Sequence, residues 1–86
     1  MPELSRFYGI IIKMHHHDHT PPHFHVEYGE FEAQFSIQGL KVIEGRVPSR
    51  VKSLVREWAG QHIAELIADW ELVSELKQPR SIKPLE

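Results

Sequence analysis

Histidine is the residue type in this sequence best suited to chemistry, and six of the seven histidines lie between residues 15 and 25. His23 and His25 are two residues apart in an alternating segment, which puts both on one face of a strand, about 6.6 Å apart. Because imidazole titrates near neutral pH, this pair could supply the general acid and general base of phosphodiester cleavage. Glu27 continues the same face, so His23, His25 and Glu27 could instead hold a divalent metal ion. A third interpretation is a polar sheet face that meets solvent or a partner.

Two consecutive prolines, Pro21 and Pro22, make a stiff link directly before this pair. Proline fixes its own φ angle and keeps the preceding residue out of helical geometry, so the chain extends or turns here. A fold back at this corner would bring Asp18 or His19 towards the pair, where either could orient one imidazole. Alternatively, Asp18 bonds only to backbone amides of its own turn. The catalytic candidates are His23, His25, His19 and Asp18. His15–His17 alternate in direction and cannot supply three ligands on one side.

Basic residues gather in another part of the sequence. Every charged side chain between residues 46 and 56 is basic, and every one between residues 57 and 75 is acidic. A helix dipole favours the opposite order by about 0.3–1 kcal/mol per charge, so one continuous helix would forgo this stabilisation. The functional interpretation is a surface for phosphate or for an acidic partner protein, made of Arg46, Arg50, Lys52 and Arg56. The alternative is that two separate helices are present, or that each set of charges pairs elsewhere.

The composition restricts the class of protein. The chain has 86 residues, no cysteine and a net charge of −2 with neutral histidine. These values predict one domain over residues 1–86 and argue against an overall basic nucleic-acid binder. Without cysteine, a disulfide framework and a thiolate nucleophile are excluded. No apolar run approaches the ~20 residues of a membrane span, and no signal peptide is recognisable, so we expect a cytoplasmic protein without membrane association.

The N-terminal half has the alternation of β-strands. We predict strands at Phe7–Met14, His23–Tyr28, Phe31–Ile37 and Leu40–Ile43. Short turns at Gly29-Glu30 and Gln38-Gly39 separate the last three. These segments predict an antiparallel meander.

The C-terminal half changes to a helical period. From Pro48 onwards, apolar residues recur at three- and four-residue steps, which predicts either one helix kinked at Gly60 or two helices. His62 falls on the apolar stripe and is predicted to be a core histidine bonded to a backbone carbonyl. Residues 77–86 contain two prolines and are predicted to form an extended tail. The resulting fold class is α+β, an antiparallel sheet of three to four strands packed on one face by a C-terminal helical segment. The other face would be open to solvent, to a second copy in a homodimer, or to another partner.

Three segments carry a resemblance to a known family. The runs LSRFYGIIIKM, DHTPPHFHVEYGEFEA and VREWAGQHIAEL…DWEL resemble the domain-of-unknown-function family 4160, from Leu4 to about Leu72. The motif positions of the family correspond here to Asp18, His19, Pro21, Pro22, His23, Phe24, His25, Trp58 and His62. Where many relatives have aromatic or basic residues, this chain has His15–His17, so no shared role is expected for these three.

The resemblance implies a function that the residues alone do not. Members of this family are small bacterial proteins, often encoded beside another short protein in a toxin–antitoxin-like arrangement. By this resemblance we expect a toxin-like component of a type II module, neutralised by a small cognate protein and acting on RNA in the manner of a ribonuclease. The alternative is a non-enzymatic module that binds a partner or a divalent metal through its histidines.

Overall fold

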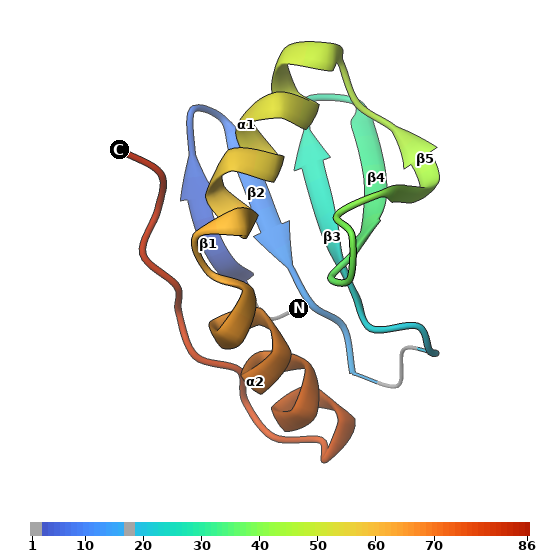
Figure 1. Cartoon of the computed structure of the whole chain (residues 1–86), viewed down its shortest axis with the longest axis vertical. Helices are drawn as coiled ribbons and strands as arrows, with labels where there is room; N and C mark the ends of the chain where they lie inside the picture. Colours follow the sequence, from blue (N-terminus) through green and yellow to red (C-terminus); the bar gives the residue numbers. More distant parts are fainter. Residues whose placement is uncertain (1–2, 17–18) are drawn as a thin grey trace.

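The computed structural model describes residues 3–16 and 19–86. These residues contain five strands and two helices (Figure 1). The strands are β1 (Glu3–Phe7), β2 (Ile10–Lys13), β3 (His23–Tyr28), β4 (Phe31–Ser36) and β5 (Val42–Arg46). The helices are α1 (Ser49–Gly60) and α2 (Ile63–Ser74). Each strand pairs antiparallel with the next, giving one sheet in the order β1-β2-β3-β4-β5. The α+β class is confirmed, but the prediction of three to four strands is wrong because the sheet has five.

The extra strand is β1, which shares only Phe7 with the predicted strand Phe7–Met14. A turn directly after Phe7 separates it from β2, the part of the prediction that is a strand. Tyr8 and Gly9 both have positive φ angles, 50° and 79°, and they join β1 to β2. Two consecutive left-handed residues close a tight hairpin whose twist matches that of the strands. This turn lies within an almost wholly apolar run, so hydrophobicity alone did not reveal it.

The last strand is also shifted from its predicted position. Leu40 has a φ angle of 50° and lies in the turn after β4, so β5 begins at Val42 rather than Leu40 and continues to Arg46. Gly45 packs directly against β4: a Cβ atom built on it would lie 2.3 Å from the Glu32 carbonyl oxygen. The close pairing of β4 and β5 therefore depends on glycine at this position.

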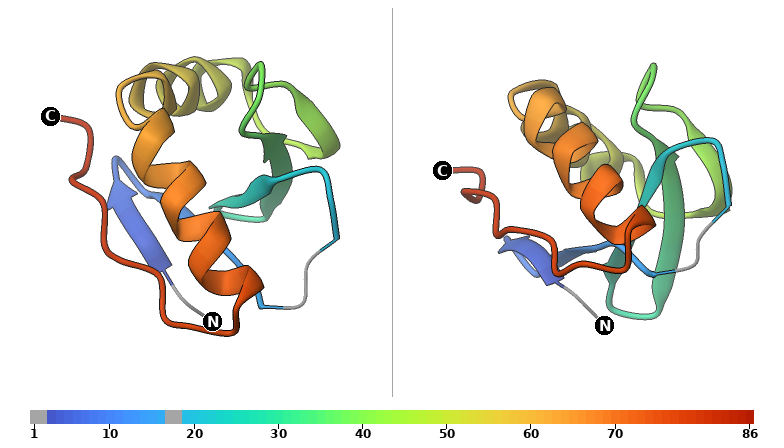
Figure 2. Two further views of the ribbon diagram at one scale, coloured as in Figure 1. Left: turned by 60° about the horizontal axis from the view of Figure 1, so that its bottom comes forward. Right: turned by 90° about the horizontal axis from the view of Figure 1, so that it is seen from below.

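The C-terminal segment forms two helices, which decides between the two predicted forms. α1 ends at Gly60, and His62 directly precedes α2. Both helices lie on the same side of the sheet, and α1 crosses β2 and β3 (Figures 1 and 2). No helix in the described part of the chain is long and apolar enough to cross a membrane.

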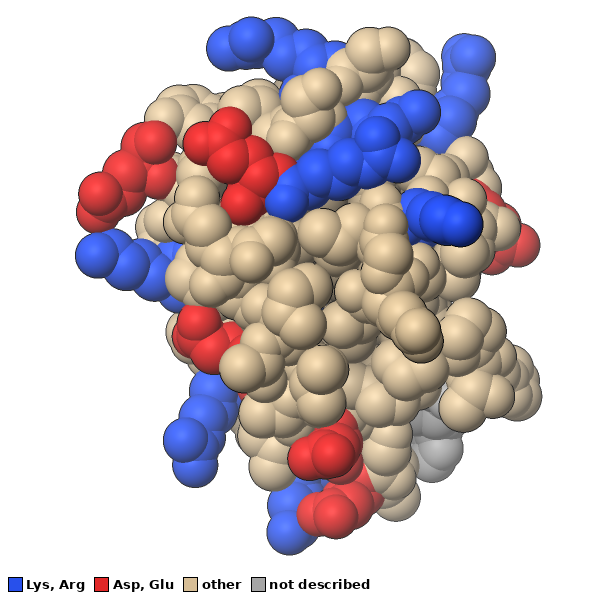
Figure 3. Space-filling view, viewed as in Figure 1, with Lys and Arg blue, Asp and Glu red and all other residues tan. Residues whose placement is uncertain are grey.

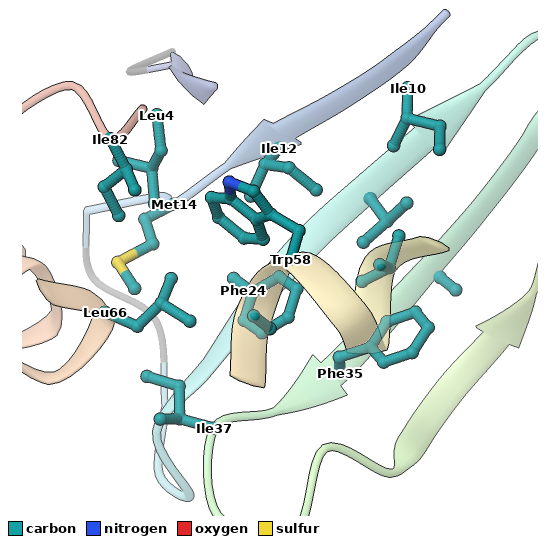
Figure 4. Close-up of a cluster of buried hydrophobic side chains, with 14 of the residues drawn as sticks. Leu4, Ile10, Ile12, Met14, Phe24, Phe35, Ile37, Trp58, Leu66 and Ile82 are labelled. Atoms are coloured by element: carbon teal, nitrogen blue, oxygen red, sulfur yellow. The ribbon is translucent and has the colours of Figure 1, made fainter. Parts of the chain in front are cut away.

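The core lies between α1 and the sheet face below it. Trp58 of α1 is fully buried at its centre, with its ring 5.5 Å from the Phe7 ring and 6.2 Å from the Phe24 ring (Figure 4). Phe24 stacks in turn on Phe35 of the neighbouring strand at 5.7 Å. Burial of these large rings is the dominant stabilising contribution here.

The tail, residues 77–86, contains no helix or strand, and it runs back beside β1 (Figures 1 and 2). The Ile82 amide donates to the Leu4 carbonyl at 2.7 Å, and the Trp58 indole N–H donates to the Lys83 carbonyl at 2.8 Å. Ile82 itself is buried in the core. The tail therefore covers the outer edge of β1 and completes the packing around Trp58.

A buried carboxyl group holds the start of this tail. Asp69 of α2 is 2% exposed, and its Oδ1 accepts a hydrogen bond from the Arg80 backbone N–H at 2.8 Å. Its Oδ2 is buried without a hydrogen-bond partner in the described residues. Burial raises the pKa of the Asp69 carboxyl above its usual value, against the smaller lowering effect of the Arg80 N–H.

Candidate functional site

Of the predicted histidines, His25 lies on the face of the sheet that turns away from α1, and His23 lies at the end of that face, against Trp70 of α2. In β3, Phe24 and Val26 are fully buried in the core, and strand alternation directs His25 and Glu27 to the opposite face. The pairing of the strands aligns Lys13, His25, Gln34 and Glu44 in one row across this face. We call it the histidine face, made of His15, His23 and His25 together with Lys13, Glu27, Glu32, Gln34 and Glu44.

Three imidazoles come together at one end of this face. The ring of His15 stacks on the ring of His25, with centroids 3.8 Å apart and planes 14° apart. The His23 ring lies 5.1 Å from the His25 ring at a steep angle. His16 turns away, and its Nε2 donates to the Lys77 carbonyl of the tail at 3.0 Å. The structure thus brings His23 and His25 together and adds His15, for which the sequence predicts no role in the site.

The position of His15 follows from the register between β2 and β3. Lys13 pairs with His25 across the two strands. His15 lies two residues beyond Lys13, so its side chain emerges on the same face. The signal that could have found it was therefore a cross-strand register, which the alternation within one segment does not supply.

His23 is held in one orientation by its neighbours. It is only 6% exposed, and its Nδ1 lies 2.8 Å from the Pro21 carbonyl oxygen. Since a carbonyl oxygen only accepts, Nδ1 is the protonated nitrogen in this contact. On its other side the ring packs 5.3 Å from the Trp70 ring of α2. His23 therefore lies between Trp70 and His25, and little of its side chain meets solvent.

The remaining polar groups of the face are tied to one another. Lys13 Nζ and Glu27 form an ion pair at 3.2 Å, and Gln34 Nε2 donates to Glu44 at 2.7 Å. A hollow of about 280 Å³ lies beside His25, over β3, β4 and β5, with Glu32, Gln34, Glu44 and Gly45 in its lining. Two carboxylates in this lining favour a cationic or neutral group there over a phosphate.

The predicted metal ligand Glu27 and the predicted orienting residue His19 have different surroundings. Glu27, the carboxylate of the predicted metal site with His23 and His25, is bound to Lys13. Within residues 3–16 and 19–86, no three His, Asp or Glu side chains are grouped so that they could hold a metal ion. His19 is exposed on the loop before the two prolines, and Asp18 lies outside the described residues. The orienting role predicted for Asp18 or His19 stays a prediction.

His62, predicted to be a core histidine, lies at the start of α2 instead. Its Nδ1 contacts Glu65 Oε1 at 2.5 Å, and its ring lies 5.5 Å from the Trp58 ring. The predicted carbonyl partner is wrong because α1 ends at Gly60, so His62 precedes a new helix instead of lying within one.

The basic residues do not join the histidines. β5 runs parallel to β3, so Arg46 at the end of β5 and His23 at the start of β3 lie at opposite ends of the sheet. The Arg46 guanidinium lies 5.7 Å from the Phe31 ring centroid, and the Arg56 Nε donates to the Leu40 carbonyl at 3.1 Å. Lys and Arg side chains gather around the start of α1, which carries Arg50 and Lys52 (Figure 3). The two predicted halves of an RNA site are thus separate surfaces.

The comparison with known proteins identifies a family. A family model described as a domain of unknown function, DUF4160, matches residues 9–71. This range includes all seven histidines, whereas β1 and the tail lie outside it. No curated protein matches the chain, and no solved structure matches it. Because the match covers well over half of the sequence, the chain belongs to the DUF4160 family.

Proposed function

We propose that this protein is the cytoplasmic, toxin-like component of a type II toxin–antitoxin pair, and that its histidine face is the surface that the small cognate protein binds. The observation that carries the proposal is the uncovered sheet face with a stacked His15–His25 pair at one end. The pairing with a second small protein is what the family resemblance implies.

The physical character of the face suits a protein partner. Flat rings that are already packed against one another lose little conformational entropy when they are covered. Around them, Lys13–Glu27 and Gln34–Glu44 form a polar rim whose groups are already paired, as in protein interfaces with an apolar or aromatic centre. Glu32 and Glu44 add negative charge beside the His25 hollow, so a lysine or arginine of the partner is the complementary group.

The test uses two variants that each add one positive charge. Gln34→Arg changes the centre of the histidine face, and Ser53→Arg changes an exposed position of α1 in the other layer. We expect Gln34→Arg to weaken the complex with the protein of the neighbouring gene at least about tenfold, and Ser53→Arg to leave it unchanged, by isothermal titration calorimetry. Equal affinities for the two variants, or no complex with the wild type, would reject the proposal.

A second candidate function is RNA cleavage, and the stacked imidazoles favour it. At a centroid distance of 3.8 Å, the two rings are close enough to act on one phosphodiester, one as proton donor and the other as proton acceptor. General acid–base cleavage of a phosphodiester requires these two roles. The carboxylates beside His25 oppose phosphate binding there, which is why this candidate ranks second.

Growth and RNA integrity after induction test the second candidate. If His15 and His25 transfer protons, the double variant His15→Ala/His25→Ala no longer inhibits growth and leaves RNA intact. His16→Ala still inhibits growth and degrades RNA. His16 is the matched control because its ring lies on the tail and not on the histidine face. A wild type that neither slows growth nor degrades RNA removes this candidate and the toxin-like role, whereas the calorimetry tests partner binding by the histidine face separately.

A further inference from the structure

A larger and more apolar hollow lies beside α2, at the end of the sheet where β3 begins. It has a volume of about 570 Å³, and its apolar lining comes from Pro21, Pro22, Ile37, Ile63 and Ile67. Three separate parts of the chain build it: the double-proline corner, the turn after β4 and one stripe of α2. We call it the α2 groove.

One side chain of this groove contributes little to the core. Ile67 is 45% exposed, although Leu66 and Val73 of the same helix are fully buried. Ile63 and Ile67 are four residues apart and therefore form one continuous apolar stripe along the helix. Apolar side chains grouped in a hollow, unlike a single exposed one, are typical of a binding surface.

The ionisable residues of α2, the helix that lines one side of the groove, are all acidic, although Asp69 is buried against the tail. The helix contains Glu65, Asp69 and Glu71 and no lysine or arginine. Glu71 lies one helical turn beyond Ile67, at the rim of the stripe, and it has no ion pair among residues 3–16 and 19–86. Glu65, by contrast, is occupied by His62. A partner that fills the groove must therefore supply positive charge next to its apolar side chains.

The groove is adjacent to the histidine face without being part of it. Ser36 belongs to the groove lining and pairs with His23 in the sheet. Trp70, next along α2, contacts His23 from the other side. One partner could therefore reach both surfaces, with different side chains.

We propose that the α2 groove binds a short basic amphipathic helix of a partner protein. Apolar side chains at three- and four-residue spacing enter between Ile67 and Pro22, and a flanking lysine or arginine pairs with Glu71. Apolar grooves recognise amphipathic helices through this spacing, and the acidic rim selects for basic ones. The inference stands apart from the proposed role of the histidine face, since it uses none of its residues.

Two synthetic helical peptides test the groove directly. Both carry leucines at positions i, i+3 and i+7, and they differ only in lysine or glutamate at the flanking positions. We expect the lysine peptide to bind measurably by fluorescence anisotropy and the glutamate peptide to bind at least about tenfold more weakly. Glu71→Lys should weaken binding of the lysine peptide and strengthen that of the glutamate peptide. Equal binding of the two peptides, or none by either, would overturn the proposal.

A matched pair of variants locates the binding surface. Ile67→Glu and Ile43→Glu replace two isoleucines that are both 45% exposed, one in the groove and one on β5. Only Ile67→Glu should reduce lysine-peptide affinity, with thermal melts by circular dichroism showing that both variants fold. An equal loss in both would overturn the proposal, as would a homodimer in sedimentation that Ile67→Glu disrupts, because the groove would then be a self-interface. Neither result bears on the Gln34→Arg test, so the two proposals fail independently.

Discussion

Replacing Gly45 with alanine should destabilise the protein far more than an ordinary surface substitution. Gly45 has a φ angle of 74°, which costs a residue with a side chain about 1 kcal/mol. The new Cβ would lie 2.3 Å from the Glu32 carbonyl oxygen and 3.1 Å from the Ala33 Cα, both backbone atoms that no rotamer change can move. Forcing β4 and β5 apart adds about 1–3 kcal/mol, as overpacking does in cores. We expect a total loss of about 2–4 kcal/mol in the free energy of unfolding.

The control is Gly29→Ala, which has the same backbone requirement without the contact. Gly29 has a φ angle of 57°, and a Cβ there would meet no atom within 4 Å. The reduced freedom of the unfolded chain offsets part of its φ cost, so the expected loss is below about 1 kcal/mol. Urea unfolding gives both values, and hydrogen exchange should show faster exchange of β5 amides in Gly45→Ala alone. Equal losses in the two variants would show that the close approach of β4 and β5 is not what Gly45 provides.

Three further predictions concern the tail and its anchors. Trp58→Phe should lose about 2 kcal/mol in urea unfolding, since it removes the indole hydrogen bond to the tail and leaves a smaller ring in the core. Ile82→Ala should lose about 2–3 kcal/mol for a side chain only 3% exposed, and a loss below about 0.5 kcal/mol would mean that the tail does not pack in solution. Because the pKa of Asp69 is raised in the folded protein, this carboxyl keeps its proton to a higher pH in the folded protein than in the unfolded chain. Between the usual aspartate pKa of about 4 and the raised pKa, the free energy of unfolding therefore falls as the pH rises. Thermal melts of Asp69→Asn from pH 4 to 7 should show a smaller fall in Tm than those of the wild type. An equal fall in both proteins would contradict the raised pKa of Asp69.

Strand alternation and the helical period, which are patterns within single segments, predicted where most strands and helices lie. The bounds of β3, His23–Tyr28, are those that alternation predicts, and the helical period locates the two helices and their break near Gly60. The turn at Tyr8-Gly9 was missed because tyrosine is uncommon in a left-handed conformation and the surrounding run is apolar. Hydrophobic alternation detects which residues are buried, but it does not detect a reversal of the chain inside an apolar run.

The candidate site depends on contacts between residues that are far apart in the sequence. His23 and His25 were predicted together from their spacing, whereas the stack of His15 on His25 depends on the pairing of β2 with β3. The separation of the basic residues from the histidines likewise follows from the direction of β5 relative to β3. These relations are properties of the assembled sheet, and spacing within a single segment does not contain them.

The contact between the tail and β1 has a consequence for how this chain varies among its relatives. The Ile82 amide donates to the Leu4 carbonyl, yet both residues lie outside the matched range, residues 9–71. The segment defined by sequence similarity is therefore smaller than the unit that packs together in this structure, in which both ends of the chain contact Trp58. Substitutions at Leu4 and Ile82 should covary, and a relative that lacks one terminal segment should have replaced the other. A fragment cut at the limits of the match would expose the indole edge of Trp58 and a bare β2 strand, and would aggregate.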